Sequence, residues 1–226
     1  MPGGCPVRYQ GTGSIPANVT ARAGRTKEDG GAVPTRAELE AAYGAVVPDL
    51  VGPGARVLLV GINPSLYSGW TATHFARPGN RLWRTLHEAG FTDRRLHPSE
   101  SEAILAAGLG ITNLVARATA RADELTDAEV QAGVQPLGAL VRRCRRKWGQ
   151  PSWVAFLGIS TYRVAFRAPR ATVGRQPGQF EGAGVWVLPN PSGLNAHYQQ
   201  PDLTAAYKEL SDAVVAIATT ASDKSE

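Results

Sequence analysis

The sequence RVLLVGI, residues 56–62, runs directly into Asn63-Pro64-Ser65, and this stretch decides the fold class of the chain. An apolar run without polar alternation is typical of a strand that is covered on both faces. Two more segments have this character, WVAFLG at residues 153–158 and VWVLP at residues 185–189. Helical patterns separate the three segments, which indicates right-handed crossovers between parallel strands. We therefore predict an α/β fold, a three-layer α/β/α sandwich with a short, mainly parallel central sheet.

Helix starts are marked by pairs of residues with the spacing of a capping box, in which two side chains satisfy the free backbone donors of a first turn. These pairs are Thr35 with Glu38, Ser99 with Glu102, and Thr126 with Glu129. The last pair precedes an amphipathic run that extends to about residue 146. We expect a final helix from about residue 202 to residue 218.

All of these elements fit one domain, residues 34–218. Residues 1–33 are rich in Gly, Pro, Thr and Arg and lack an apolar period, so we expect a flexible basic arm there. Residues 219–226 are mostly polar, and we expect them to fray from the end of the last helix.

Charge favours a polyanionic partner, and the rest of the composition excludes several classes of protein. The chain has 226 residues and a formal net charge of +5, and 20 of its 24 basic residues are arginine, which binds phosphate through two parallel hydrogen bonds. Two cysteines and four histidines without metal-ligand spacing exclude a zinc finger, a four-cysteine cluster and a disulfide scaffold. No apolar run approaches the roughly 20 residues of a membrane span. We expect a cytoplasmic protein.

Two strands are followed by the same tripeptide. In open parallel sheets the ligand crevice lies beyond the carboxyl ends of the strands, where residues 63–65 and residues 190–192 both read Asn-Pro-Ser. A residue before proline is held in an extended conformation, so its amide can face a ligand. A single Asn-Pro is a common turn opener. Two copies at neighbouring strand ends favour a binding site.

Two longer stretches identify a family. VLLVGINPSLYSGWTATHFARPGNRLWRTLHEAGFTD, starting at residue 57, and WVLPNPSGLNAHY, starting at residue 186, resemble the mismatch-specific uracil and thymine DNA glycosylases of the uracil-DNA glycosylase superfamily. The resemblance extends from about residue 56 to residue 213. It implies an enzyme that flips uracil, or a related mismatched or damaged pyrimidine, out of DNA and hydrolyses its N-glycosidic bond. An abasic site would remain.

The resemblance also implies the partners. The substrate would be double-stranded DNA that contains uracil or a mismatched or damaged pyrimidine. The resemblance does not decide whether single-stranded DNA is also a substrate. No metal or organic cofactor would be needed, and the protein would act as a monomer. No lysine lies in either motif, which argues against a Schiff-base lyase step.

A base pocket follows from the same resemblance. Phe75 matches the aromatic residue that stacks on the flipped base, and core packing is the alternative role for this side chain. Ser65 stands where typical members have glycine, and Asn113 stands where some have lysine, so the substrate selectivity is left open. The expected pocket residues are Ile62, Ser65, Ser68, Phe75, Asn113 and Asn190.

DNA contacts are expected from a second group of residues. Leu194 matches the apolar wedge that fills the gap left in the base stack, and its alternative role is that of a loop residue folded onto the domain. Phosphate contacts are expected from the neighbours of Leu194 and from two arginines of the first motif. This group is Ser192, Gly193, Leu194, Asn195, His197, Arg77 and Arg81.

Two residues are candidates for catalysis. Asn63 matches the family residue that positions the attacking water, which an amide can orient but cannot deprotonate. A carboxylate could do both, and Asp93, among the cations of residues 90–95, is the candidate that we select. Its alternative role is a cap or an ion pair in a loop that lies away from the site. With only an amide at position 63, the alternative function is a non-catalytic protein that binds damaged or abasic DNA.

Overall fold

The sheet contains five strands, in the order β2-β1-β3-β5-β4. This computed structural model describes residues 33–222. The pairs β1–β2, β1–β3 and β3–β5 are parallel, and β4 pairs with β5 in the antiparallel direction. The α/β fold with a mainly parallel sheet is therefore confirmed. The strands are β1 (Val57–Gly61), β2 (Leu109–Asn113), β3 (Trp153–Leu157), β4 (Gly174–Phe180) and β5 (Ala183–Leu188).

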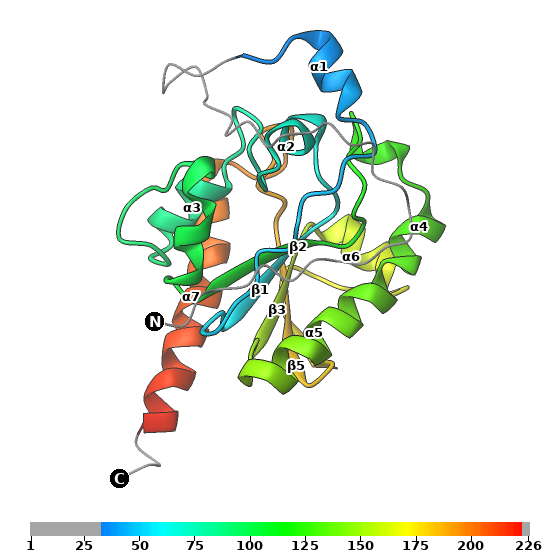
Figure 1. Cartoon of the computed structure of the whole chain (residues 1–226). Helices are drawn as coiled ribbons and strands as arrows, with labels where there is room; N and C mark the ends of the chain where they lie inside the picture. Colours follow the sequence, from blue (N-terminus) through cyan, green and yellow to red (C-terminus); the bar gives the residue numbers. More distant parts are fainter. Residues whose placement is uncertain (1–32, 223–226) are drawn as a thin grey trace.

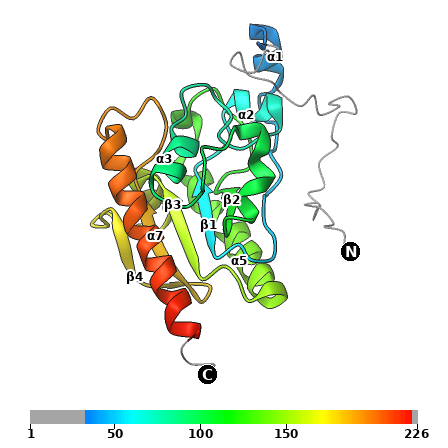
Figure 2. The ribbon, with the colours of Figure 1, turned by 90° about the vertical axis from the view of Figure 1, so that its left-hand side faces the viewer.

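Helices cover both faces of this sheet and one of its ends. On one face lie α3 (Leu82–Glu88), the 3-10 helix η2 (Pro98–Leu105) and α7 (Gln200–Ser222), and on the other lie α4 (Asp127–Ala132), α5 (Val134–Trp148) and α6 (Ile159–Ala165). Figure 2 shows α7 lying lengthwise along the sheet. Helices α1 (Arg36–Ala41) and α2 (Leu66–Thr71) lie beyond the end of the sheet at which β1 stops (Figure 1). A short 3-10 helix, η3 (Ala122–Glu124), precedes α4.

Each face of the sheet has its own apolar core. Leu86 of α3 and Tyr207 of α7 belong to the first core, together with Leu59 of β1. Val141 of α5 and Phe156 of β3 belong to the second. Burial of such side chains on both faces explains why the predicted strands read as continuous apolar runs.

Two of the three predicted capping boxes are confirmed, those of Thr35 with Glu38 and of Thr126 with Glu129. The box of Ser99 with Glu102 is wrong. His97 caps η2 instead, because its Nδ1 accepts from the Ser99 amide while the Glu100 carboxylate accepts from the His97 amide. Proline is favoured in the first turn of a helix, and Pro98 sets this earlier start.

Helix lengths also differ from the prediction. The run after Thr126 is divided at Gly133 into α4 and α5, and a Cβ atom at that position would overlap the carbonyl of Leu114. The last helix continues to Ser222, past the predicted end at residue 218. Apart from Val33, the predicted basic arm lies outside the described residues, as do residues 223–226.

The predicted set of strands lacked β2 and β4. The five residues of β2 end in Thr112 and Asn113, which leaves too short an apolar run to be recognised. Strand β4 is the outer edge of the sheet, and most of its side chains are partly or fully exposed. It also contains Pro177, and proline is tolerated in sheets mainly at such edges.

Candidate active site

A cavity of about 630 Å³ lies at the carboxyl ends of the parallel strands. Gly61, Asn113 and Leu157 line it from the ends of β1, β2 and β3, and Asn190 lines it just after β5. The two Asn-Pro-Ser segments are not at adjacent strands, because β3 lies between β1 and β5. Residues of both segments nevertheless line the cavity, together with Leu157 at the end of β3. The cavity therefore lies at the edge of the sheet where the sequence predicts the site.

Asn63 has a fixed orientation in this cavity. Its Nδ2 donates to the carbonyl of Arg117 at 3.0 Å and to Thr119 Oγ1 at 2.7 Å. A carbonyl can only accept, and the Thr119 hydroxyl gives its own hydrogen to the carbonyl of Arg121, so both neighbours require the amide nitrogen at this point. The Oδ1 of Asn63 has no hydrogen-bond partner within residues 33–222 and remains available to a water molecule.

Asn113 is held by a buried histidine that sequence reasoning missed. His74 is 4% exposed, and its Nε2 donates to the carbonyl of Pro48 at 2.9 Å. In the neutral ring Nδ1 is then an acceptor, and it receives a hydrogen bond from Asn113 Nδ2 at 3.2 Å. One amide hydrogen of Asn113 is thus committed. The other amide hydrogen and Oδ1 remain for a ligand.

The segment at residues 46–50 supports this pair from behind. Pro48 binds His74, while Asp49 accepts a hydrogen bond of 2.5 Å from Thr112, the residue before Asn113. Leu50 pairs with Ile111 of β2 in the antiparallel direction. Burial raises the pKa of Asp49.

The pH dependence of stability should report on the neutral state of His74. Burial lowers the pKa of His74 from 6.5 to about 4. Between pH 6.5 and pH 4, His74 is therefore protonated in the unfolded chain but stays neutral in the folded chain. The free energy of unfolding falls as the pH decreases through this window, because protonation stabilises the unfolded state. We expect His74→Gln, which cannot titrate, to remove up to about 3 kcal/mol of that decrease. Urea denaturation of both proteins at a series of pH values measures the difference, and parallel profiles would contradict the prediction.

Phe75 faces the cavity in a strained backbone conformation. Its φ angle is 51°, in the left-handed region, which costs an ordinary residue roughly 1–2 kcal/mol. The ring lies against Gly61: a Cβ atom there would lie 3.0 Å from Phe75 Cζ and would overlap Asn113 Oδ1. The absence of a side chain at residue 61 therefore leaves room for both pocket residues.

The two serines of the predicted pocket also line the cavity. Ser65 caps α2, and its hydroxyl accepts from the Ser68 amide and donates to Ser68 Oγ, both at 3.1 Å. Ser68 Oγ in turn accepts from the Ala76 amide at 3.3 Å. The extra hydroxyl at position 65 is therefore engaged in the helix cap.

The loop after β5 carries Leu194, which is 73% exposed. Asn190 Oδ1 accepts from the Ser192 amide at 2.9 Å, and Asn195 Nδ2 donates to the Asn190 carbonyl at 2.9 Å. These bonds direct the Asn190 amide, whose Nδ2 has no partner in the described part of the chain. Of this loop, Asn190, Ser192 and Leu194 line the cavity, while Gly193, Asn195 and His197 do not.

Charged side chains also line the cavity. Arg77 lines it, as do Arg121 and Asp123, which form a two-pronged ion pair with one hydrogen bond of 2.9 Å. The hydrogen bonds from Arg121 lower the pKa of Asp123. Among the described residues Asp123 is the one carboxylate in the cavity lining. Sequence reasoning missed Thr119, Arg121 and Asp123 because β2, which leads to them, was not predicted.

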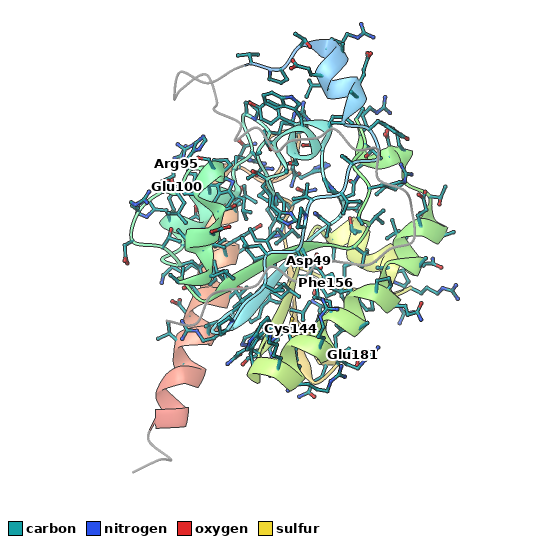
Figure 3. All side chains as sticks on the ribbon, viewed as in Figure 1. Asp49, Arg95, Glu100, Cys144, Phe156 and Glu181 are labelled. Carbon is teal, nitrogen blue, oxygen red and sulfur yellow. The ribbon has the colours of Figure 1, made fainter. Side chains whose placement is uncertain are left out.

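Asp93 and Arg81 are not in the cavity lining. Helix α3 begins next to Asn80, which lines the cavity, and carries the chain about 10 Å onward. Asp93 lies in the loop beyond its far end and is exposed. Figure 3 shows Arg95, from the same loop, at the side of the molecule. The selection of Asp93 as a catalytic carboxylate is therefore not supported by its position, and the guanidinium of Arg81 contacts the loop after β5.

No three His, Cys, Asp or Glu side chains between residues 33 and 222 lie close enough together to hold a metal ion. No helix in this range is both long and apolar enough to cross a membrane.

Comparisons with known proteins give a family and a similar solved structure. The family model of the uracil DNA glycosylase superfamily matches residues 48–211, a range that includes every residue of the cavity lining. The fold is similar to that of a candidate uracil DNA glycosylase from Methanosarcina acetivorans, solved by solution NMR, with a TM-score of 0.51 and 17% sequence identity. This similarity covers 75% of the present chain and 99% of the other. At such low identity it supports the fold alone.

Proposed function

The chain belongs to the uracil DNA glycosylase superfamily, and from this premise we propose that it releases uracil from DNA by hydrolysis, with a preference for uracil in mismatched pairs. The observation that carries the proposal is the orientation of Asn63, whose free Oδ1 faces a cavity built from four strand ends. The proposed substrate is double-stranded DNA, and the proposed active form is a monomer.

Recognition of the base is assigned to Asn113 and Phe75. A flipped uracil would stack on Phe75, an interaction worth about 1–3 kcal/mol. Asn113 would offer its Oδ1 and its remaining amide hydrogen to an edge of the base. Because His74 holds the amide nitrogen, the group cannot rotate to exchange donor for acceptor. This fixed polarity supports discrimination between uracil, which has an N–H and a carbonyl on that edge, and cytosine, which has the reverse.

The reaction would proceed with departure of the base ahead of water attack. The C1′–N1 bond breaks and its electron pair leaves with the base, so positive charge develops on the sugar. The oxygen of the water held by Asn63 then bonds to C1′ and loses its proton to solvent, since an amide cannot accept it. DNA phosphates would stabilise the cationic sugar electrostatically. Good leaving groups should react fastest.

Contacts with DNA are assigned to the exposed loop after β5 and to the arginines that line the cavity. Leu194 would fill the space that the flipped nucleotide leaves, and the Asn190 amide would contact the sugar or a phosphate. Arg77 and Arg121 would lie near the DNA backbone, and the net charge of +5 favours that approach.

A non-catalytic role in binding damaged DNA is the second candidate. It is favoured by one observation: the single carboxylate in the described cavity lining, Asp123, is already paired with Arg121. Without a general base, release of uracil could be too slow to matter.

Single-turnover release of the base separates the two functions. Labelled duplexes with U·G, U·A, T·G or C·G pairs, and single-stranded DNA with uracil, would be incubated with excess protein and then cleaved with alkali at abasic sites. We expect release from U·G to exceed release from U·A, because a weaker pair costs less to open. The C·G duplex is the control. Tight binding to U·G without release would favour the binding protein, and neither binding nor release would contradict both candidates.

A further inference from the structure

Arg81 makes an unusual set of contacts at the first turn of α3. Its Nη1 donates to the carbonyl of Tyr198 at 2.7 Å. Its Nη2 donates to the carbonyls of Ser192 and Asn195, at 2.8 Å and 3.0 Å. The Arg81 amide donates to the carbonyl of Pro191 at 2.9 Å. One residue of α3 therefore binds four carbonyls of the loop that carries Leu194.

The position is electrostatically unfavourable for a cation. Arg81 is the N-cap residue of α3, where the helix dipole favours negative charge. No carboxylate pairs with it within the described residues. The carbonyl oxygens of the loop after β5 are the groups that offset this cost, so the arrangement connects the loop to the helix.

Most N–H groups of the Arg81 guanidinium are not available to bind a phosphate. Of its five N–H groups, three are used by the loop carbonyls. The Nε is buried and has no partner among residues 33–222, so it cannot reach a ligand outside. The Arg81 side chain therefore binds the loop instead of the DNA.

The loop is also confined from the side of Gly79. A Cβ atom at Gly193 would lie 2.5 Å from the Gly79 carbonyl, so the two backbones are in close contact. With Gly193 seated there and Arg81 holding Ser192 and Asn195, the residue between them has little backbone freedom. That residue is Leu194.

We propose that Arg81 is a positioning residue that holds the loop of residues 190–198 in the conformation needed for Leu194 to enter the base stack. The proposal rests on the proposed function in one respect, the wedge role of Leu194. This role differs from the phosphate contact that the first sequence motif predicted for Arg81. Loss of the hydrogen bonds from Arg81 lets the tip of the loop move. Misplacement of a side chain by about 1 Å can reduce a reaction rate by about a hundredfold.

The test compares two duplexes that differ only opposite uracil. In one, uracil faces guanine, so the protein must open the pair and fill the gap. In the other, uracil faces a pyrene nucleoside, whose large ring occupies the gap and makes a wedge unnecessary. We expect Arg81→Ala to slow single-turnover release from the first duplex by about ten- to a hundredfold and to leave release from the second near the wild-type rate.

Two variants and a control keep the result interpretable. Arg81→Lys retains the charge but lacks the planar fork that reaches three carbonyls, so it should show the same pattern, and it serves if Arg81→Ala does not fold. Arg84→Ala, on the same helix and paired with Glu88, should behave as wild type. The double variant with Leu194→Ala should be no slower on U·G than Leu194→Ala alone, because Arg81 acts through the wedge.

Fluorescence of 2-aminopurine placed next to uracil gives a second readout that needs no catalysis. If wild type flips the base without releasing it, and Arg81→Ala flips it only opposite pyrene, the proposed hydrolysis fails and the role of Arg81 stands. Equal defects on both duplexes, or no defect on either, would overturn that role. Wild-type rates for Arg81→Lys would overturn it as well. A wild type that neither flips nor releases uracil in either duplex would overturn both proposals.

Discussion

Replacing Asn63 by alanine should slow single-turnover release of uracil from a U·G duplex by about a hundred- to a thousandfold, the range found when one preorganised polar group is removed from an active site. The Oδ1 of Asn63 is the acceptor that would hold the attacking water, and its Nδ2 is anchored on Arg117 and Thr119. Binding of the same duplex should change little, because in the proposed reaction Asn63 would contact the attacking water instead of the base. Release rates and binding by anisotropy, measured side by side, check both parts.

Asp93→Ala is the matched control for this prediction. Asp93 is an exposed carboxylate beyond the far end of α3, so its removal should leave the release rate at the wild-type level. A large loss for Asp93→Ala with none for Asn63→Ala would reverse the assignment and would require the loop after α3 to reach the DNA.

Gly61→Ala should reduce release of uracil about a hundredfold while the protein remains folded. The added methyl group would lie 3.0 Å from Phe75 Cζ and would overlap Asn113 Oδ1, so both groups that would contact the base must move. Because the strain falls on two side chains that line an open cavity, they can shift into it without disrupting the sheet. Release rates and thermal unfolding of the variant measure the two effects.

Gly52→Ala provides the corresponding control. A Cβ atom at Gly52 would meet Leu105 Cδ1 at 3.4 Å, an ordinary van der Waals distance, and this glycine does not line the cavity. It should keep the wild-type release rate. If Gly61→Ala also kept that rate, neither Phe75 nor Asn113 would determine recognition of the base.

The sequence was informative where chemistry follows directly from local pattern. The apolar runs of β1, β3 and β5 predicted the fold, and Asn63 and Asn190 follow two of these strands, so the site could be located at their carboxyl ends. Leu194 was predicted to be either an apolar wedge or a loop residue folded onto the domain, and its side chain is largely exposed.

The rest of the site depends on contacts between distant residues. His74 meets Asn113 across 39 positions, and Asn63 meets Thr119 across 56, so no local spacing reveals either pair. Arg81 was predicted to bind DNA, because its type and motif are visible in the sequence while the direction of its side chain is not. Asp93 was selected for its charge, but the length of α3 decides its distance from the cavity.

Both edges of the sheet are closed to another chain. On one side the segment at residues 46–50 runs antiparallel to β2 and pairs Leu50 with Ile111. On the other side β4 presents Pro177, which lacks an N–H, and an irregular register between Arg175 and Gln179. Neither edge offers a regular row of free donors and acceptors, so growth of aggregates by strand addition is disfavoured. Resistance to this form of aggregation suits the excess of protein over DNA that single-turnover measurements require.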